Sequence, residues 1–367
     1  MEEISRNNQD RAEISIKDQI KKFAIDSLYG FNTIILIGIG RKLGIFDYLY
    51  EKTKSISKAD IYNVAKFTLD ELAERLNLDV IYLDAWLHLA LECGLFEIDD
   101  LNKKSLKTAP FVYDLLIDHN HISYIGGTLG AFYNIALAQE IMLKNFKTGK
   151  TMDLLKLPGD VVKDLQERSR RFGKLIEKIF TKSFTDFCKN LNKQGSILEV
   201  GCGYGFNIET WAKVYEKARF VGTDIDPNGI KFAQKLVDQN KWNERIKIYK
   251  ISTNEYARNT KDKFNLIILN QVLHEMNPNE KYRRQLFKDL YLLLNDKGIL
   301  LIGESVVPDT FAPKEPFKLY DITHKFSEAG SSRFYNEKTF KTFLDSTPFT
   351  KAEFIKEKGI KFWVIRK

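Results

Sequence analysis

The C-terminal half of the chain alternates short apolar segments, typical of buried strands, with longer segments whose apolar residues recur at helical spacing. Strands are expected at residues 197–200, 219–224, 246–251, 264–269 and 299–302, and helices at 206–215, 228–239, 279–294 and 337–344. Such alternation implies a parallel sheet with helices on both faces. Two final strands, 352–357 and 360–366, are joined only by Lys358 and Gly359, too short a link for a parallel crossover. The pattern predicts a Rossmann-like α/β domain ending in an antiparallel hairpin.

A glycine-rich turn follows the first of these strands. Residues 196–205 read Ser-Ile-Leu-Glu-Val-Gly-Cys-Gly-Tyr-Gly, and a helical segment begins directly afterwards. A strand, a glycine turn and a helix in that order place bare backbone N–H groups beside a ligand. The dinucleotide fingerprint requires its third glycine one position later, where this chain has Phe206. The turn therefore indicates a ligand other than a dinucleotide, and a tight turn without any ligand is the alternative.

Polar residues stand where the following strands end. Ligands of such sheets bind at the carboxyl ends of the strands, and a carboxylate there can accept hydrogen bonds from ribose hydroxyls. Asp224 ends the second strand and suits that role, whereas Asp226 precedes Pro227 and is typical of a helix start. The third and fourth strands end in two further polar pairs, Ser252-Thr253 and Asn270-Gln271.

The motif Glu-x-Gly-x-Gly-x-Gly, beginning at Glu199, resembles the first motif of class I S-adenosylmethionine-dependent methyltransferases. The resemblance implies S-adenosyl-L-methionine as the cofactor. Many relatives have an aspartate after the third strand that contacts adenine, where this chain has hydroxyls. The N-P-P-Y-type motif of nucleic-acid base methyltransferases is missing after the fourth strand, which argues against that reaction. The implied cofactor-binding residues are Glu199, Gly201, Gly203, Asp224, Ile225, Ser252, Thr253, Asn270 and Gln271.

Residues 272–276, Val-Leu-His-Glu-Met, are the second informative segment. With the helical N-terminal region, they resemble the small-molecule O-methyltransferases of the plant caffeate and isoflavone type and the bacterial polyketide type. These have a histidine base in a His-Asp-Trp context, which His274 matches, while Glu275 and Met276 replace its neighbours. Glu304, in the next strand, inherits the glutamate that flanks the histidine. The resemblance covers most of residues 20–367 and implies His274 and Glu304 as the catalytic pair.

Two further family features fall near residues 313–333. A later family glutamate is expected near Ser332, and Glu328 lies close to that position but out of register. Residues 313–326 are expected to cover an acceptor pocket, with Phe317, Tyr320 and His324 as substrate contacts.

Residues 68–98 have the outline of a helix-turn-helix with a following wing. Thr68 and Glu71 form a capping box, and Gly94 closes the second helix. Residues 67–100 contain nine acidic residues and one basic residue, Arg75. A DNA reader needs positive charge to neutralise phosphates, so a balance of −8 argues against DNA binding.

The expected organisation has four parts. They are a flexible N-terminus at 1–17, a winged-helix-like dimerisation domain at 18–110, a helical linker and acceptor-pocket region at 111–190, and a cofactor-binding methyltransferase domain at 191–367. Helical spacing over residues 20–50 is interrupted near Gly38 and Gly40, which we expect to serve close helix packing.

Charge and cysteine content set the remaining expectations. The net charge of +8 is modest for 367 residues and demands no acidic partner. Three cysteines lie far apart without metal or disulfide spacing, as in a reducing compartment. Residues 1–22 are too charged for a signal peptide, and the apolar run at 34–39 is too short to span a bilayer. We therefore expect a cytoplasmic protein with no membrane span, nucleic acid or metal.

These features lead to one main hypothesis and two alternatives. The main hypothesis is methylation of a hydroxyl on a small aromatic or polyketide-like acceptor by a homodimer formed through the N-terminal domain. His274 acts as general base while Glu304 holds its tautomer, because an imidazole with a pKa of ~6.5 can take the proton of a phenol with a pKa of ~10 as attack proceeds. The alternatives are C-, N- or S-methylation of a pigment, lipid or peptide without an essential base, and a DNA-binding regulator whose methyltransferase-like domain senses a ligand.

Overall fold

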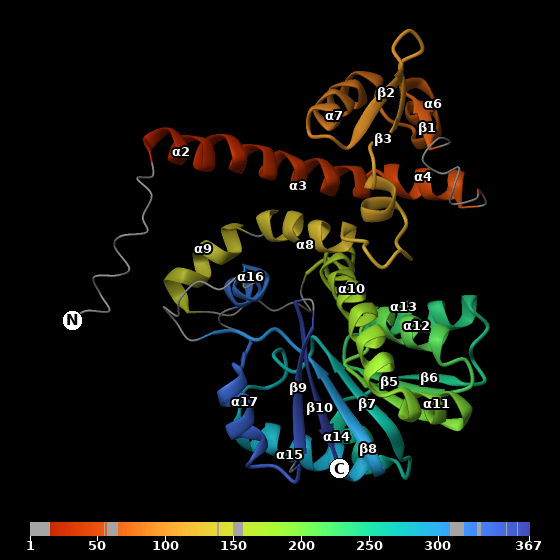
Figure 1. The fold of residues 1–367 in the computed structure, drawn as a ribbon, viewed down its shortest axis with the longest axis vertical. Coiled ribbons are helices and arrows are strands. Elements are labelled where there is room, and N and C mark those ends of the chain that lie inside the picture. The colour runs from red at the N-terminus through yellow and green to blue at the C-terminus, as the bar shows by residue number, and fades with distance from the viewer. Residues whose placement is uncertain are drawn as a thin grey trace. The chain divides into compact units, whose positions relative to one another are not determined.

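The computed structural model describes residues 15–54, 56, 65–137, 139–149, 157–308, 319–328, 332–349, 351–357 and 359–367. The chain divides between Tyr133 and Asn134 into two compact units, and each is considered by itself (Figure 1). Most of the predicted flexible N-terminus, residues 1–17, lies outside the described residues.

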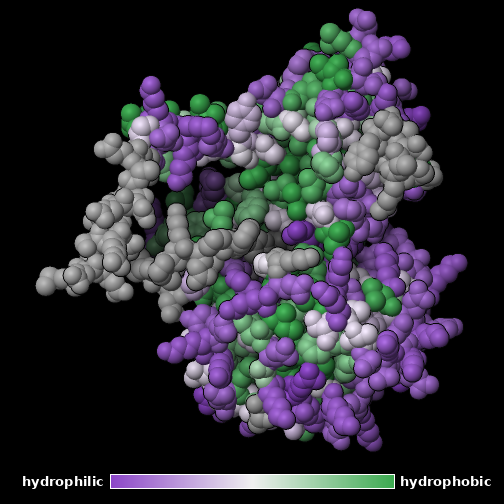
Figure 2. Space-filling view, in the orientation of Figure 1, coloured by the Kyte–Doolittle hydropathy of each residue, from purple (hydrophilic) through white to green (hydrophobic). Residues whose placement is uncertain are grey.

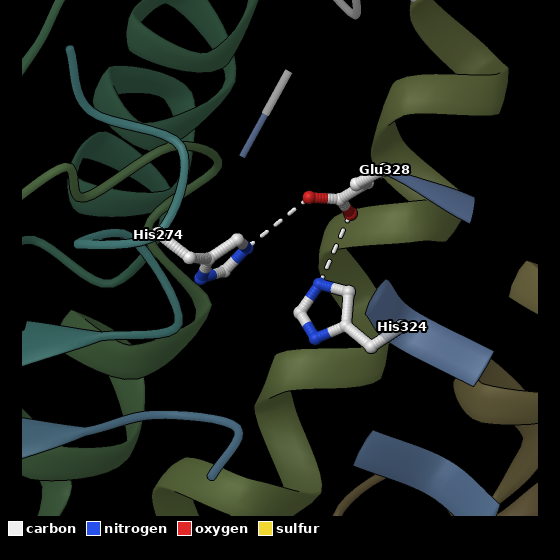
Figure 3. A group of neighbouring side chains, drawn as sticks. All are labelled: His274, His324 and Glu328. Atoms are coloured by element: carbon white, nitrogen blue, oxygen red, sulfur yellow. Dashed lines mark ion pairs between the residues drawn. The ribbon is translucent and has the colours of Figure 1, made fainter. Parts of the chain in front are cut away.

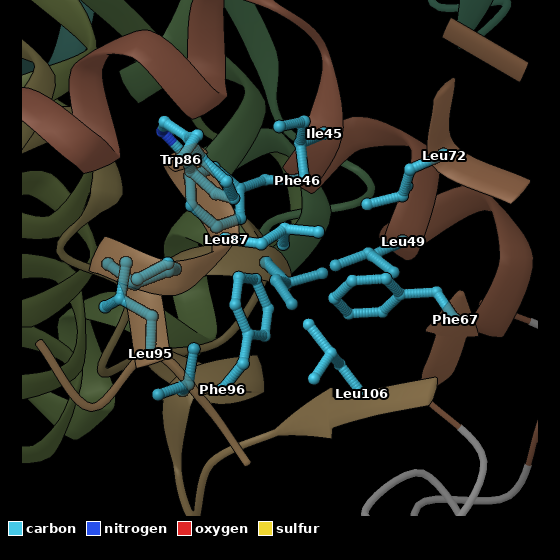
Figure 4. Close-up of a cluster of buried hydrophobic side chains, with 14 of the residues drawn as sticks. Ile45, Phe46, Leu49, Phe67, Leu72, Trp86, Leu87, Leu95, Phe96 and Leu106 are labelled. Carbon is cyan, nitrogen blue, oxygen red and sulfur yellow. The ribbon is translucent and has the colours of Figure 1, made fainter. Parts of the chain in front are cut away.

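The first unit begins with helical segments and continues with two helices and a small sheet. These elements are α2 (Ile16–Ile20), the π-helical η1 (Lys21–Asp26), α3 (Ser27–Lys42), α4 (Ile45–Thr53), β1 (Lys66–Thr68), α6 (Leu69–Leu76), α7 (Val80–Glu92), β2 (Phe96–Asp100), β3 (Ser105–Thr108) and the π-helical η2 (Tyr113–Ile117). The three strands form an antiparallel sheet in the order β1-β3-β2. Its side chains join those of the helices in one buried core, drawn in Figure 4.

Helix α3 runs through Gly38 and Gly40 without a break, although the helical spacing of apolar residues is interrupted there. A Cβ on Gly38 would overlap the ring of Tyr133, and one on Gly40 would lie 2.8 Å from the indole of Trp86. The two glycines therefore let neighbouring side chains approach the helix backbone, as predicted. The helix ends at Lys42, and Gly44 just beyond it has a φ of 77°, the left-handed conformation that glycine adopts most readily.

The capping signals at residues 68–94 are confirmed in part. The hydroxyl of Thr68 accepts the N–H of Glu71 at the start of α6, and Gly94 has a φ of 72° just beyond α7. The carboxylate of Glu71 does not complete a capping box, because it binds Lys52 and Tyr48. The contacts of Glu71 with Lys52 and Tyr48 therefore take the place of the local hydrogen bond that a capping box would form.

One helical stretch of the first unit, Ile16–Lys42, is long and apolar enough to cross a membrane by length and composition alone. The predicted apolar run at 34–39 is its buried end, since Leu36 and Ile37 belong to the core. Lys17, Asp18 and Lys21 lie in its other half.

The second unit is a seven-stranded sheet covered by helices. Its elements are the last turn of α8 (Gly126–Leu137), which begins in the first unit, and α9 (Gln139–Thr148), α10 (Gly159–Ser183), α11 (Thr185–Gln194), β4 (Ser196–Val200), α12 (Phe206–Val214), β5 (Arg219–Asp224), α13 (Pro227–Gln239), β6 (Ile246–Lys250), α14 (Thr253–Asn259), β7 (Phe264–Asn270), α15 (Glu280–Leu293), β8 (Leu294–Gly303), α16 (Leu319–Ser327), α17 (Glu337–Leu344), β9 (Lys351–Glu357) and β10 (Ile360–Arg366). The strand order is β6-β5-β4-β7-β8-β10-β9.

Strands β4 to β8 are parallel, and β10 is antiparallel to both β8 and β9, so the predicted hairpin is confirmed. Alternate residues point to opposite faces of the sheet. Ile197 therefore packs with α10 to α13, whereas Leu198 packs with α14, α15 and α17. The exposed surface of this unit is mostly hydrophilic, with apolar side chains in small separate groups (Figure 2).

Candidate active site

A cavity of about 540 Å³ lies at the carboxyl ends of the central strands β4, β5 and β7. These strands are neighbours in the order β5-β4-β7, and Figure 1 labels β5 and β7. Strands β4 and β5 pair in parallel with Val200 opposite Thr223, so their carboxyl ends lie at the same edge of the sheet. The residues predicted for the cofactor that line the cavity are Glu199, Gly201, Asp224, Ile225, Ser252, Thr253, Asn270 and Gln271.

The glycine turn wraps tightly against the end of β5. Gly201, Gly203 and Gly205 have φ angles of 66°, 47° and 77°, all in the left-handed region. The N–H of Gly203 donates to Oδ2 of Asp224 at 2.7 Å, and the N–H of Asp226 donates to Oδ1 at 2.8 Å. Gly203 does not line the cavity itself. It contacts Asp224, which does. The predicted helix start is confirmed, since Asp226 caps α13 by accepting the N–H groups of Asn228 and Gly229.

Two carboxyl groups are buried at this end of the cavity. Burial raises the pKa of Glu199 to about 8, and the nearby Asp224 adds to that effect. Burial also raises the pKa of Asp224, although the N–H groups of Asp226 and Gly203 oppose the increase. Both carboxyl groups thus lie in a poorly solvated part of the cavity wall. A hydrogen bond from a ligand to either group is stronger there than in water.

Amide side chains in the cavity wall have buried polar atoms without hydrogen-bond partners. They are Oδ1 of Asn134 and both polar atoms of Asn207 and of Asn270. A buried unsatisfied polar group is costly and calls for a partner. Beside them, Ile225 keeps 58% of its surface exposed at the cavity. This wall, polar in one part and apolar in another, fits a ligand with both hydroxyl or amino groups and a flat apolar ring.

Helix α10 contributes a residue that the sequence patterns did not single out. Oε1 of Gln166 accepts the N–H of Tyr204 at 2.9 Å, and the Gln166 side chain occupies the space that a Cβ on Gly203 would need. Gln166 lines the cavity and fixes the glycine turn from the side opposite Asp224. The only signal for it was the amphipathic stretch leading into the motif.

The two hydroxyl residues after β6 have structural partners. Oγ of Ser252 caps α14 by accepting the N–H of Glu255 at 3.3 Å. Oγ1 of Thr253 lies 3.4 Å from Oγ1 of Thr223. Both residues line the cavity, and an adenine-binding role for either one stays a prediction.

His274 and Glu304 form a buried pair beyond the other end of the cavity. Nδ1 of His274 lies 2.7 Å from Oε2 of Glu304, and the two residues are 2% and 6% exposed. Oε1 of Glu304 also accepts the N–H of Leu273 at 2.6 Å. Because Glu304 follows the end of β8 and His274 follows β7, the adjacent parallel strands bring the two together, as the resemblance implied.

Glu328 and His324 complete this cluster (Figure 3). One carboxylate oxygen of Glu328 lies 3.3 Å from Nε2 of His274, and the other lies 3.0 Å from Nε2 of His324. Ser332 donates its hydroxyl to Glu328 at 2.8 Å. Glu328, out of register in the sequence, therefore contacts His274. No periodicity or motif pointed to it.

The charges of this cluster depend on one another. Burial lowers the pKa of His274, but the carboxylates of Glu304 and Glu328 outweigh burial and hold that pKa well above its usual range. Burial raises the pKa of Glu328, but His274 and His324 outweigh it and hold that pKa well below its usual range. The two carboxylates therefore favour the protonated form of His274, and the two histidines favour the ionised form of Glu328.

The remaining predicted residues that the structure describes lie in or near this end of the unit. Glu328 and Ser332 line the cavity. His274 does not line it, but it contacts Glu328. His324 is 1% exposed and contacts Glu328 and Ser305. Tyr320 lies in α16, where its side chain is not described, and Phe317 lies outside the described residues.

Comparisons with known proteins agree with this architecture. Residues 198–300 match the family model described as a methyltransferase domain. The chain matches no curated protein.

Solved structures share the fold over nearly the whole chain. The crystal structure of LaPhzM is 16% identical with a TM-score of 0.67, and the match covers 95% of this chain and 99% of that one. Human N-acetylserotonin methyltransferase, in complex with S-adenosylmethionine, is 15% identical with a TM-score of 0.65, covering 96% and 99%. The mitomycin 7-O-methyltransferase MmcR is 14% identical with a TM-score of 0.61, covering 96% and 98%.

The domain match and the shared fold define the class of protein. The chain is an enzyme with a class I methyltransferase domain, and S-adenosylmethionine is the cofactor of that class. The unsatisfied amides, the two buried carboxyl groups and the exposed Ile225 fit the polar and apolar parts of such a molecule.

Proposed function

We propose that the chain methylates a hydroxyl group of a small aromatic or polyketide-like compound in the cytoplasm, as a homodimer formed through its first unit. The observation that carries this proposal is the single cavity that joins Asp224 and Asn270 at one end to Glu328 and Ser332 at the other. Its volume of about 540 Å³ lies within the ~300–1,000 Å³ typical of small-molecule sites. The fold shared with the mitomycin 7-O-methyltransferase supports the choice of oxygen.

The residues at the glycine-turn end hold the cofactor in this proposal. Asp224 and Glu199 accept its hydroxyl and amino donors, Asn270 and Asn207 use their unsatisfied polar atoms, and Ile225 covers its ring. When bound, S-adenosylmethionine supplies an electrophilic methyl group on a sulfonium. Gln166 and the glycine turn fix this end, so that positioning provides much of the acceleration.

The neutral form of His274 accepts the proton of the acceptor hydroxyl. The O–H bond breaks and an N–H bond forms at Nε2, the imidazole atom that faces Glu328. Glu304 accepts the Nδ1–H and thereby fixes which nitrogen carries the free lone pair. Glu328, which lines the cavity, orients the incoming hydroxyl and stabilises the imidazolium that results.

A second candidate is methylation at carbon, nitrogen or sulfur of a pigment, lipid or peptide, without an essential base. The burial of His274 behind Glu328 favours it, because an acceptor in the cavity meets Glu328 before it meets the imidazole. In this candidate Glu328 positions the acceptor and His274 only balances its charge.

The homodimer proposal rests on apolar side chains exposed along the helical stretch Ile16–Lys42. Their exposed area would be costly in water and is the kind that subunit interfaces cover. They are Ile16, Ile20, Phe23, Ile25, Leu28 and Phe31. Light scattering after gel filtration is expected to give twice the mass of one chain, and a monomer at micromolar concentration would contradict the proposal.

Transfer of a labelled methyl group to a panel of small phenols, polyketide-like hydroxyl compounds, thiols and amines tests the chemistry. We expect label to appear in hydroxyl acceptors and to be lost with Asp224→Ala. A control variant, Asp296→Ala, changes a fully exposed carboxylate and should transfer label at the native rate. Label found only in carbon, nitrogen or sulfur acceptors would favour the second candidate.

A further inference from the structure

The buried cluster of two imidazoles and one carboxylate has the composition and spacing of a metal centre. Nε2 of His274, Nε2 of His324 and a carboxylate oxygen of Glu328 all lie within 4.8 Å of one another. Figure 3 shows both rings turning these nitrogens towards the Glu328 carboxylate. Two histidines and one carboxylate are a ligand set that Zn²⁺ and related divalent ions take.

The separations within the cluster match those between neighbouring ligands of one ion. An ion bonded to nitrogen and oxygen at about 2.0–2.2 Å separates the two atoms by about 3.0–3.5 Å in tetrahedral or octahedral geometry. The corresponding distances run from the two oxygens of Glu328, 3.3 Å from Oε2 to Nε2 of His274 and 3.0 Å from Oε1 to Nε2 of His324. Nε2 of His274 is buried and faces the Glu328 carboxylate, so an ion between the two would bind both.

The outer nitrogens of both rings are held as in known metal sites, where a ligating histidine donates its second N–H to a neighbouring oxygen. Nδ1 of His274 lies 2.7 Å from Oε2 of Glu304. Nδ1 of His324 lies 2.8 Å from Oγ of Ser305, whose hydroxyl donates to Gln271 and therefore accepts from the ring. Both rings are thus fixed in the orientation that directs Nε2 inward.

Charge and surroundings also suit an ion. Glu304 and Glu328 are two buried carboxylates, and a divalent cation supplies the same positive charge as two imidazolium protons. Phe334 stacks on His274 at a centroid distance of 5.0 Å and meets His324 edge-on at 5.2 Å, which encloses the rings. Ser332, whose hydroxyl binds Glu328 at 2.8 Å, stands at the cavity side, where a fourth ligand or water could bind.

We propose that His274, His324 and Glu328 form a binding site for a divalent transition-metal ion of the Zn²⁺ class, and that a bound ion inhibits methyl transfer. The inhibition rests on the proposed function, because an ion on Nε2 of His274 takes the lone pair that the base uses. The binding itself does not depend on that function.

The test uses the full chain prepared without a histidine tag, stripped with a chelator and dialysed against Zn²⁺ or Co²⁺. We expect one ion per chain by elemental analysis, with Co²⁺ giving visible absorption of nitrogen and oxygen coordination. His324→Ala and Glu328→Gln should each weaken Zn²⁺ binding at least tenfold. His88→Ala, which removes a histidine whose side chain is 74% exposed, should bind Zn²⁺ like the native chain.

Three results would overturn the metal site. They are less than 0.2 ion per chain, equal loss of the ion in His88→Ala, or a thiolate-to-Co²⁺ absorption band that assigns the ion to a cysteine. Circular dichroism of each variant shows whether it folds, and the Co²⁺ spectrum of the native chain decides the ligand type if a variant does not. If Zn²⁺ binds and methyl transfer is not inhibited, the metal site is supported and the role of His274 as the base is contradicted.

Discussion

Oδ2 of Asp224 accepts the N–H of Gly203 at 2.7 Å, which ties the end of β5 to the glycine turn after β4. The carboxylate therefore shapes the turn before any ligand arrives. Its other oxygen accepts the N–H of Asp226 at 2.8 Å, at the start of α13. In the proposed function the same side chain also meets the cofactor, so one residue couples the shape of the turn to the binding of the ligand.

Gly201→Ala tests the glycine turn. An alanine must adopt a φ of 66°, and its Cβ would overlap the side chain of Val272. The left-handed conformation alone costs about 1–2 kcal/mol. We expect the free energy of unfolding of the second unit to fall by at least that amount, measured with urea. Gly159→Ala is the control, since its Cβ would lie 3.8 Å from the nearest atom, and equal stability of the two variants would contradict the prediction.

Glu199→Gln tests the buried carboxyl group through pH. The pKa of Glu199 is about 8 in the folded chain, above its usual range in an unfolded one. Between these pKa values the unfolded chain has lost the proton and the folded chain keeps it, so native stability falls as pH rises. The slope is about 1.4 kcal/mol per pH unit for this group and ends near the folded pKa.

The glutamine variant has no proton to lose, so its unfolding free energy should fall less between pH 5 and pH 8 than that of the native chain. Urea titrations at four pH values measure the difference. Parallel pH dependences of the two proteins would show that Glu199 ionises in the fold as it does in water.

Much of the second unit could be predicted because its signals are local. Alternating apolar residues, the glycine turn and the cap at Asp226 placed most strands and helices within a few residues. Parallel neighbouring strands then brought His274 to Glu304. Glu328 and Gln166 were not predicted as members of the site, because each arrives from a distant helix whose docking depends on tertiary packing.

In the first unit, tertiary packing outweighs a local sequence signal. Gly38 and Gly40 interrupt the apolar spacing of the sequence, yet the helix continues because burial against Tyr133 and Trp86 compensates for the poor helix propensity of glycine. Propensity is a local property, and a packed neighbour outweighs it.

Gly38→Ala follows from that contact. The added methyl group would overlap the Tyr133 ring, and overpacking of this kind costs about 1–3 kcal/mol. Gly30→Ala, in the same helix with open space around it, should instead stabilise by about 0.5–1 kcal/mol. Thermal unfolding followed by circular dichroism compares the two, and a stabilised Gly38→Ala would contradict the packing role.

His274→Ala and His274→Gln separate the two candidate functions. Loss of a general base lowers kcat by about 10²–10⁴-fold. We expect a loss in that range on a hydroxyl acceptor, with the affinity for S-adenosylmethionine unchanged because His274 lies beyond the other end of the cavity. His88→Ala is the control histidine variant. Less than a threefold loss of kcat in both His274 variants would favour positioning without a base.

Titration calorimetry with S-adenosylmethionine tests the cofactor assignment most directly. The full chain should bind one molecule per chain, and Asp224→Ala should weaken binding at least tenfold, which corresponds to about 1.4 kcal/mol. Asp296→Ala, at a fully exposed carboxylate, should bind like the native chain. Absence of binding to the folded native chain, or binding that is equal in Asp224→Ala, would contradict the proposed site.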